Sequence, residues 1–346
     1  MHDSPRGGAD APDHHLGPRF VNTDPSVRIG GDFWRWQRER RAAGLPRPPA
    51  DGYDAFARRW RVAPDFGYGL RVRLDSSDVE ANDIQPARPV VWWLGHATVL
   101  LRIGELHVIT DPHLGGRASP LSFIGPARRV PAPARADELP RIDVALISHN
   151  HYDHLDTRSI RHLVARNPHM TCCAPLGLGA WLRRRGVSHV HELDWWQRIE
   201  HDGVEVHCVP AQHWSSRTLF DRNRTLWCGW VVRAPGASFY FAGDTGYTPR
   251  LAEVAARLGS PDLAALPIGA YAPRWFMRGQ HVDPPEAVRI HEELLIRQSL
   301  AIHWGTFELA DDSLDEPPAV LRAALAERGL SEETFWLLRQ GEARCW

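Results

Sequence analysis

Three histidines and an aspartate lie within one six-residue segment, His149-Asn150-His151-Tyr152-Asp153-His154. The segment directly follows an apolar stretch, residues 144–148, that is typical of a buried strand. Because alternate side chains of an extended segment share a face, His149 and His151 can bind one metal ion together. A helix expected to begin after residue 155 would place Asp153 and His154 at its first turn, facing a second ion. The chain has 19 histidines, but a chance occurrence of this spacing behind a strand is a poor explanation, and we predict a metal site.

The segment cannot complete two metal sites, because a zinc ion binds about four ligands, with one position left for water in catalytic sites. Three further candidates follow other predicted strands: His213, Asp244 and His303. Each of them alone is more simply explained as a structural residue at a strand end. Together with the first segment they supply seven ligands, enough for two ions that share one carboxylate.

The composition excludes several other chemistries. All 41 basic residues are arginine, so a Schiff-base lysine, a phosphate-loop lysine and a lysine general base are absent. A formal net charge of −1 provides no basic field to recruit nucleic acid, and we expect no nucleic-acid partner. A hydrophobic content of 43% and a charged content of 24% are ordinary for a globular protein.

The cysteines and the apolar stretches indicate a cytoplasmic location. The five cysteines show no pairing pattern, which favours reduced thiols. We find no signal peptide at the N-terminus and no apolar run of about 18 residues that would cross a membrane. Peripheral association with a membrane is compatible with this composition.

Two regions of different character are expected along the chain. Residues 1–85 are predicted to form an arm and a short helix draped on the domain, and residues 86–346 a single hydrolase domain. The short helix, residues 33–41, interleaves aromatic and basic side chains. It could touch anionic lipid, although packing of its aromatic side on the domain is favoured. The long loop 112–140 is expected to be functional or disordered.

The strands and helices alternate in two halves, which indicates two sheets with helices on their outer faces. Strands are predicted at residues 71–74, 90–94, 98–103, 106–111, 144–148, 170–174, 189–193, 204–209, 226–232, 238–242, 262–266, 300–303 and 334–338. Helices are predicted at residues 156–164, 178–185, 249–258, 285–295 and 319–328.

The ordered set of candidate ligands resembles that of the metallo-β-lactamase superfamily. More narrowly, the surrounding motifs resemble the N-acyl-phosphatidylethanolamine-hydrolysing phospholipases D. They are Trp93-Leu94-Gly95-His96-Ala97-Thr98, Thr110-Asp111-Pro112, Arg117-Ala118-Ser119-Pro120, Phe241-Ala242-Gly243-Asp244-Thr245-Gly246-Tyr247, Leu266-Pro267-Ile268-Gly269-Ala270-Tyr271, Pro273-Arg274-Trp275-Phe276-Met277, Gln280-His281-Val282-Asp283-Pro284 and Ala301-Ile302-His303-Trp304-Gly305-Thr306-Phe307. The resemblance begins near residue 90 and reaches the C-terminus; little before residue 85 aligns with the family.

The resemblance implies an α/β (α+β) fold, a four-layer αββα sandwich of the metallo-β-lactamase type. It assigns one zinc ion to His149, His151 and His213, the other to Asp153, His154 and His303, and Asp244 to both. A hydroxide bridging the two zinc ions is then the expected nucleophile. Its attack on the phosphorus of N-acyl-phosphatidylethanolamine would yield N-acylethanolamine and phosphatidic acid.

The resemblance also suggests roles for other polar and aromatic residues. The candidate catalytic residues are Asp244, Gln280 and His281. Gln280 and His281 could hydrogen-bond a phosphoryl oxygen or the leaving group, and a structural role for these two fits the sequence equally well. Asp111 and His96 are expected to orient the ligand imidazoles. Arg117 and Arg274 are expected to form structural ion pairs rather than to bind phosphate. Candidates for an acyl-chain groove are Tyr271, Trp275, Phe276 and Met277.

The sequence is also compatible with other activities and other metals. The same fold could hydrolyse a lactone or another small phosphodiester, and a catalytically silent metal-binding module is disfavoured because no expected ligand is missing. Iron or manganese would fit the same ligands as zinc. The expected partner is a phospholipid or other phosphodiester substrate, with peripheral membrane contact and a homodimer both left open.

Overall fold

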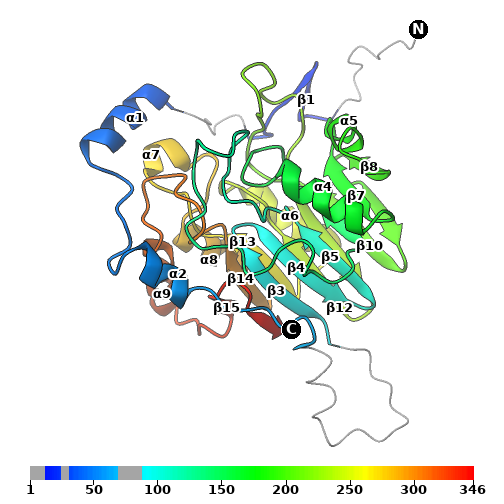
Figure 1. Cartoon of the computed structure of the whole chain (residues 1–346). Coiled ribbons are helices and arrows are strands. Elements are labelled where there is room, and N and C mark those ends of the chain that lie inside the picture. Colours follow the sequence, from blue (N-terminus) through cyan, green and yellow to red (C-terminus); the bar gives the residue numbers. More distant parts are fainter. Residues whose placement is uncertain (1–11, 25–30, 69–87) are drawn as a thin grey trace, which may run out of the picture.

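Two facing sheets with helices on their outer sides form the body of the protein (Figure 1). The structure is a computed structural model that describes residues 12–24, 31–68 and 88–346. The first seven-stranded sheet has the order β16-β3-β4-β5-β6-β7-β8. Its strands are β3 (Val90–Gly95), β4 (Thr98–Ile103), β5 (Leu106–Thr110), β6 (Val144–Leu146), β7 (Thr171–Pro175), β8 (His189–Leu193) and β16 (Ala343–Cys345).

The second sheet is formed by the other half of the chain. It also has seven strands, in the order β15-β14-β13-β12-β11-β10-β9. They are β9 (Arg198–His201), β10 (Val204–Val209), β11 (Gly229–Ala234), β12 (Ala237–Phe241), β13 (Leu263–Pro267), β14 (Gln298–Ile302) and β15 (Phe335–Trp336). The predicted αββα sandwich of two sheets is confirmed.

The helices cover the outer faces of the two sheets and one end of the molecule (Figure 1). They are α1 (Phe33–Ala42), α2 (Tyr53–Arg59), α4 (Thr157–Arg166), α5 (Gly179–Arg183), the short 3₁₀ turn η1 (Pro249–Leu251), α6 (Ala252–Leu258), α7 (Arg274–Met277), α8 (Pro284–Glu293) and α9 (Glu316–Glu327). Among the described residues, none of these helices is long and apolar enough to cross a bilayer.

Strand β3 shows how the sequence produces the layers. Its residues are all buried, because alternate side chains enter two different cores. Val91 and Trp93 belong to one core cluster, whereas Trp92 and Leu94 belong to a second cluster, which also contains apolar residues of α4 and α5. A strand that is buried on both faces reads as a continuous apolar run instead of an alternating one. This explains why the strands of this fold stand out in the sequence.

The strand directions bring the candidate ligands to one edge of the sandwich. Strands β5 to β8 run parallel, and so do β12 to β15. Strand β10 runs in the same direction as β12, because both are antiparallel to β11. The loops that follow β5, β6, β10, β12 and β14 therefore leave from carboxyl ends that lie together, as is usual for ligand sites in such sheets.

The N-terminal segments pack on this body at several places. Trp36 of α1 stacks on Phe276 with ring centroids 4.6 Å apart, which agrees with the favoured packing of this helix on the domain. Its neighbour Trp34 is 72% exposed. Phe56 of α2 is fully buried in the core between the sheets. The division at residue 85 stays a prediction, since residues 69–87 lie outside the described part of the chain.

Several elements differ from those expected from the sequence. The strand expected at residues 71–74 lies outside the described residues. The structure adds a hairpin of β1 (His15–Leu16) and β2 (Arg19–Phe20), the edge strands β9 and β16, and the short helices α2 and α7. These segments are short or partly exposed, so their apolar pattern is weak. Helix α4 begins at Thr157, where the Asp156 side chain accepts hydrogen bonds from the first turn, so Asp153 and His154 precede the helix.

Gly269, two residues after the end of β13, lies where the fold leaves no space for a side chain. A Cβ atom there would collide with the carbonyl oxygen of His303 and lie 3.1 Å from the Cα of Trp304. We expect Gly269→Ala to lower the free energy of unfolding by about 1–3 kcal/mol, because the obstructing atoms belong to the backbone. Gly116, whose Cβ would meet nothing within 4 Å, serves as the control, with a change of about 0.5 kcal/mol or less. Chemical denaturation measures both, and equal stabilities would contradict this packing.

Candidate metal centre

Three histidines form the first group of candidate ligands. The Nε2 atom of His149 lies 2.8 Å from Nδ1 of His151, and Nε2 of His213 lies 3.3 Å from the same Nδ1 atom. His149 and His151 come from the loop after β6, as the alternation of an extended segment predicted, while His213 comes from the loop after β10. The two sheets therefore each contribute to this group.

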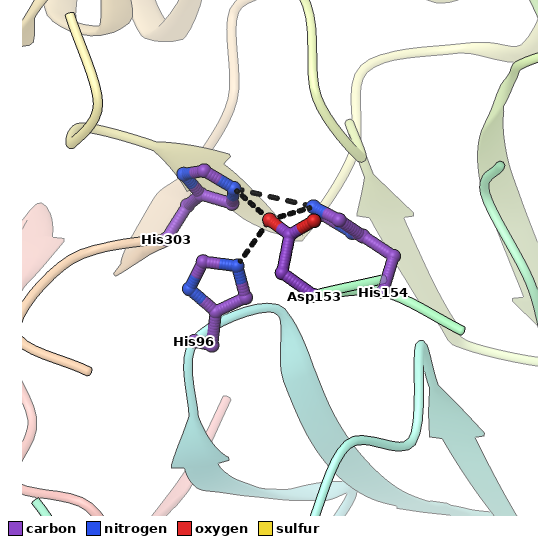
Figure 2. Close-up of side chains that lie close together, drawn as sticks. All are labelled: His96, Asp153, His154 and His303. Carbon is purple, nitrogen blue, oxygen red and sulfur yellow. Dashed lines mark hydrogen bonds and ion pairs between the residues drawn. The ribbon is translucent and has the colours of Figure 1, made fainter. Parts of the chain in front are cut away.

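Asp153, His154 and His303 form the second group (Figure 2). The Nε2 atoms of His154 and His303 lie 3.2 Å apart. One oxygen of Asp153 lies 3.3 Å from the Nε2 atom of His154 and 3.5 Å from that of His303. Figure 2 shows a fourth side chain, His96, whose Nε2 lies 2.9 Å from the same oxygen.

The carboxylate of Asp244 lies between the two groups. Its Oδ2 is 3.1 Å from Nε2 of His154 and 3.7 Å from Nε2 of His213. Its Oδ1 is 3.0 Å from Nε2 of His303. All seven side chains predicted from the sequence as metal ligands thus converge, and Asp244 contacts both groups.

A layer of hydrogen bonds orients the ligand imidazoles. Asp111 accepts a hydrogen bond of 2.7 Å from Nδ1 of His154 and one of 2.5 Å from the Ser148 hydroxyl. The carbonyl oxygen of Gln280 accepts a bond of 2.9 Å from Nδ1 of His213. With Nδ1 protonated, a neutral imidazole presents the lone pair of Nε2 to the centre. The orienting role expected for Asp111 is thus visible in its contacts.

Burial and charge set the protonation states in the cluster. Burial lowers the pKa of His151 to about 3 and that of His213 to about 4, so both imidazoles are neutral at physiological pH. Burial would raise the pKa of Asp244, but His154 and His303 outweigh it and hold that pKa well below its usual range. Burial would likewise lower the pKa of His303, yet Asp244 and Asp153 raise it to about 9. The carboxylates of Asp153 and Asp244 therefore need positive charge beside them to remain ionised.

These residues fit divalent metal ions. The carboxylates are desolvated, and the imidazole nitrogen atoms of both groups converge on them. Buried polar atoms at the centre, Oδ1 of Asp244 and Nδ1 of His281, accept or donate no hydrogen bond among the described residues. Histidine nitrogen and carboxylate oxygen are the ligands that zinc prefers, and iron or manganese accepts them as well.

The remaining sequence candidates lie around the cluster in different ways. Nδ1 of His281 is 3.9 Å from Oδ2 of Asp244, so this imidazole faces the centre. The side-chain amide of Gln280 instead donates to the sulfur of Met277 at 3.3 Å. Arg274 forms ion pairs with Asp283 at 3.1 Å and with Glu286 at 2.7 Å, as expected for a structural arginine.

The four aromatic and apolar candidates for an acyl-chain groove are mostly covered. Tyr271 is 7% exposed, and its hydroxyl donates to Glu316. Phe276 and Met277 are 8% and 4% exposed. Trp275 is the most exposed member of this group, at 42%, and the guanidinium of Arg35 lies over its ring, 4.4 Å from the centroid.

Asn22 belongs to the site, although no sequence motif points to it. Its side-chain amide donates to the carbonyl oxygen of His213 at 2.8 Å, and its Oδ1 accepts from the N–H of His213 at 3.1 Å. The indole of Trp227 also donates to this Oδ1 at 3.1 Å. A lone asparagine in an irregular arm carries no motif, and only the folded arrangement places it against a ligand.

Comparisons with known proteins agree with this fold and site. The family model described as a beta-lactamase superfamily domain matches residues 107–304. The chain is 40% identical over 262 residues to the N-acyl-phosphatidylethanolamine-hydrolyzing phospholipase D 1 of Caenorhabditis elegans, covering 72% of this chain and 74% of the worm protein. It is 32% identical over 274 residues to the mitochondrial N-acyl-phosphatidylethanolamine-hydrolyzing phospholipase D of Saccharomyces cerevisiae, covering 77% of this chain and 58% of the yeast protein.

A solved structure gives the same answer for the fold. The crystal structure of a possible metal-dependent hydrolase from Veillonella parvula superposes with a TM-score of 0.63 at 16% identity, covering 75% of this chain and 100% of that chain. At this identity the likeness concerns the fold alone.

The Asp111 carboxylate provides a direct test of the metal centre. We expect Asp111→Asn to weaken metal retention by about 10–100-fold, because the negative partner that orients His154 is lost. Asp143→Asn is the matched control: this buried carboxylate accepts from the N–H of His107 at 2.9 Å at the start of β6, the opposite end from the centre. Chelator competition followed by elemental analysis measures the retention, and equal losses in both variants would contradict the orienting role.

Proposed function

Since the chain belongs to the metallo-β-lactamase superfamily, we propose that it hydrolyses N-acyl-phosphatidylethanolamine to N-acylethanolamine and phosphatidic acid. Its membership makes it a metal-dependent hydrolase. The observation that carries the substrate class is the 40% identity to a phospholipase D that hydrolyses this lipid, across most of both chains. The converged ligand cluster supports the hydrolytic part of the proposal.

In this proposal two ions, with zinc as the first choice, occupy the cluster. His149, His151 and His213 hold one of them, and Asp153, His154 and His303 hold the other, while Asp244 contacts both. Bound divalent ions would supply Lewis acidity for a phosphoryl group and lower the pKa of water. The protein contributes neutral imidazoles, a shared carboxylate and a desolvated setting that strengthens these electrostatic interactions.

Two neighbouring residues take different parts in the proposed reaction. His281 faces the cluster, with burial lowering the pKa of its imidazole well below the usual value, so it is neutral and can hydrogen-bond a phosphoryl oxygen or the leaving group. Its backbone is held by Arg274, which donates to the His281 carbonyl oxygen at 2.8 Å. Gln280 acts as a positioning residue, because its carbonyl oxygen orients the His213 ring.

A bilayer substrate requires contact with a membrane, and exposed apolar side chains surround the ligand-bearing loops. The loop that begins with Asp111 presents Phe123, which is 76% exposed. The loop that begins with His213 presents Phe220, which is 83% exposed. Other exposed apolar residues are Leu121, Ile124 and Leu219 on the same two loops, Leu16 of β1, Phe33 and Trp34 of α1, and Trp275 of α7. In Figure 1, α1 and β1 lie at the upper side of the molecule. We propose that this apolar rim docks on a phospholipid bilayer.

The proposed reaction is tested with purified protein loaded with zinc and supplied with N-acyl-phosphatidylethanolamine in detergent micelles. We expect phosphatidic acid to form, and Asp244→Asn to lower the rate by at least about a hundredfold, because both metal sites lose a shared ligand. Mass spectrometry of the products and elemental analysis of the protein are read together. No turnover by protein with about two bound ions would exclude this lipid and favour a lactone or a small phosphodiester. Protein with no tightly bound metal would exclude both enzymatic functions.

The membrane contact is tested by vesicle sedimentation. We expect Phe123→Ser combined with Phe220→Ser to lower binding to phosphatidylcholine vesicles by about tenfold or more, because two apolar side chains no longer leave water. Leu295→Ser removes an equally exposed apolar side chain, 75% exposed at the end of α8, and should leave binding unchanged. Undiminished binding by the double variant would rule out this rim as the docking surface.

A further inference from the structure

A cavity lined by arginines lies beside the metal-binding segment. It has a volume of about 660 Å³ and opens between residues 115–123 and the first turns of α4. Four guanidinium groups line it, those of Arg117, Arg158, Arg161 and Arg217. The structural ion pair expected for Arg117 is not found among the described residues; its guanidinium donates to the carbonyl oxygens of Ser122 and Gly125. None of the predicted metal ligands lines the cavity, so it is separate from the metal centre.

The positive charge of this cavity is not neutralised. Arg158 and Arg161 line the cavity and form no ion pair with any of the described residues. Asp156 is the one carboxylate among the described residues that line the cavity. Its Oδ2 already accepts bonds of 3.0 Å from the N–H of Ser159 and 2.6 Å from the hydroxyl of the same residue. An anion that entered would therefore meet an excess of guanidinium groups.

One arginine of the cavity is held rigidly against the metal-binding segment. The guanidinium of Arg217 stacks over the ring of Tyr152, 4.0 Å from its centroid, and donates to the carbonyl oxygen of Asn150 at 3.0 Å. The hydroxyl of Tyr152 donates in turn to the carbonyl oxygen of Arg217 at 3.0 Å. Asn150 and Tyr152 alternate in sequence with the ligands His149, His151 and Asp153. The wall of the cavity is thus continuous with the ligand loop.

The rim of the cavity is apolar where its wall is cationic. Leu121 and Phe123 line it and are 46% and 76% exposed. An occupant therefore needs an anionic group at one end and apolar substance at the other. Guanidinium groups pair well with phosphate, because their planar donors match its oxygen atoms.

We propose that this cavity binds the phosphate group of an anionic phospholipid, as a site separate from the metal centre. The choice of a bilayer lipid as the ligand rests on the proposed function. The choice of a phosphate group rests on the arginines of the cavity. An anionic lipid held here places the ligand loop at the membrane surface through Tyr152 and Arg217. Phosphatidic acid, the expected product, carries the required phosphate group.

The test compares two charge-matched double variants of the full-length protein. Arg158→Gln with Arg161→Gln removes the unpaired arginines of the cavity. Arg141→Gln with Arg166→Gln removes the same charge from a different cavity, of about 450 Å³, at the other end of α4. Sedimentation with phosphatidylcholine vesicles, with and without phosphatidic acid and without any N-acylated lipid, gives the affinity.

We expect phosphatidic acid to increase vesicle binding of the wild type and of the Arg141 and Arg166 variant by about tenfold or more, and that of the cavity variant much less. If both double variants lost the enhancement of vesicle binding equally, the effect would be one of general surface charge, and the proposed site would be overturned. Full enhancement in the cavity variant would overturn it as well. Displacement of the wild type from these vesicles by an equal concentration of inorganic phosphate would make the ligand a soluble phosphate and overturn the lipid assignment.

This result is independent of the proposed reaction. Vesicle binding is measured without substrate, so a failure of the anion site leaves the hydrolysis assay intact. A failure of hydrolysis with retained, cavity-dependent binding would instead refute the proposed substrate and keep the site.

Discussion

The carboxylates of Asp153 and Asp244 are both withdrawn from water, and they impose the main electrostatic constraint on this molecule. Each sits within hydrogen-bonding or ion-pairing distance of imidazoles, and burial by itself would push both pKa values up. The neighbouring histidines reverse that direction. Two buried carboxylates so close together are stable only when positive charge lies beside them, either as protons on the imidazoles or as metal ions. The geometry of the strand ends serves to hold these groups together.

The centre also explains why neither half of the sandwich is sufficient alone. The first sheet supplies His149, His151, Asp153 and His154 together with the orienting carboxylate of Asp111. The second sheet supplies His213, Asp244 and His303. Because the candidate ligands come from both sheets, the cluster exists only where the two sheets pack on each other, and a metal ion bound there would stabilise that packing. Asn22 extends this dependence to the N-terminal segment, which fixes the backbone of His213.

Arginine supplies all the permanently charged basic side chains in a chain without lysine. Arg274 shows the structural use, since it pairs with two carboxylates and holds the carbonyl oxygen of His281. Arg128, which is partly buried, donates to carbonyl oxygens of the long loop after β5. Arg158 and Arg161 differ from these internally satisfied groups because they line one cavity together with Arg117 and Arg217, where Asp156 is the one carboxylate among the lining residues.

Local patterns in the sequence were sufficient for the doubly buried strands, for the larger helices and for all seven ligand candidates. Ligands of this kind follow strand ends, and a continuous apolar run marks a strand that packs on both faces. The short edge strands β9 and β16 and the helices α2 and α7 were not predicted, because partly exposed elements lack a regular apolar pattern. Tertiary structure alone decided which side chains meet: that Asp244 lies between the two ligand groups, that the side chain of Gln280 turns towards Met277, and that Asn22 reaches His213 across 191 positions. A sequence records residue types and spacing along one dimension, whereas these contacts depend on how two sheets close on each other.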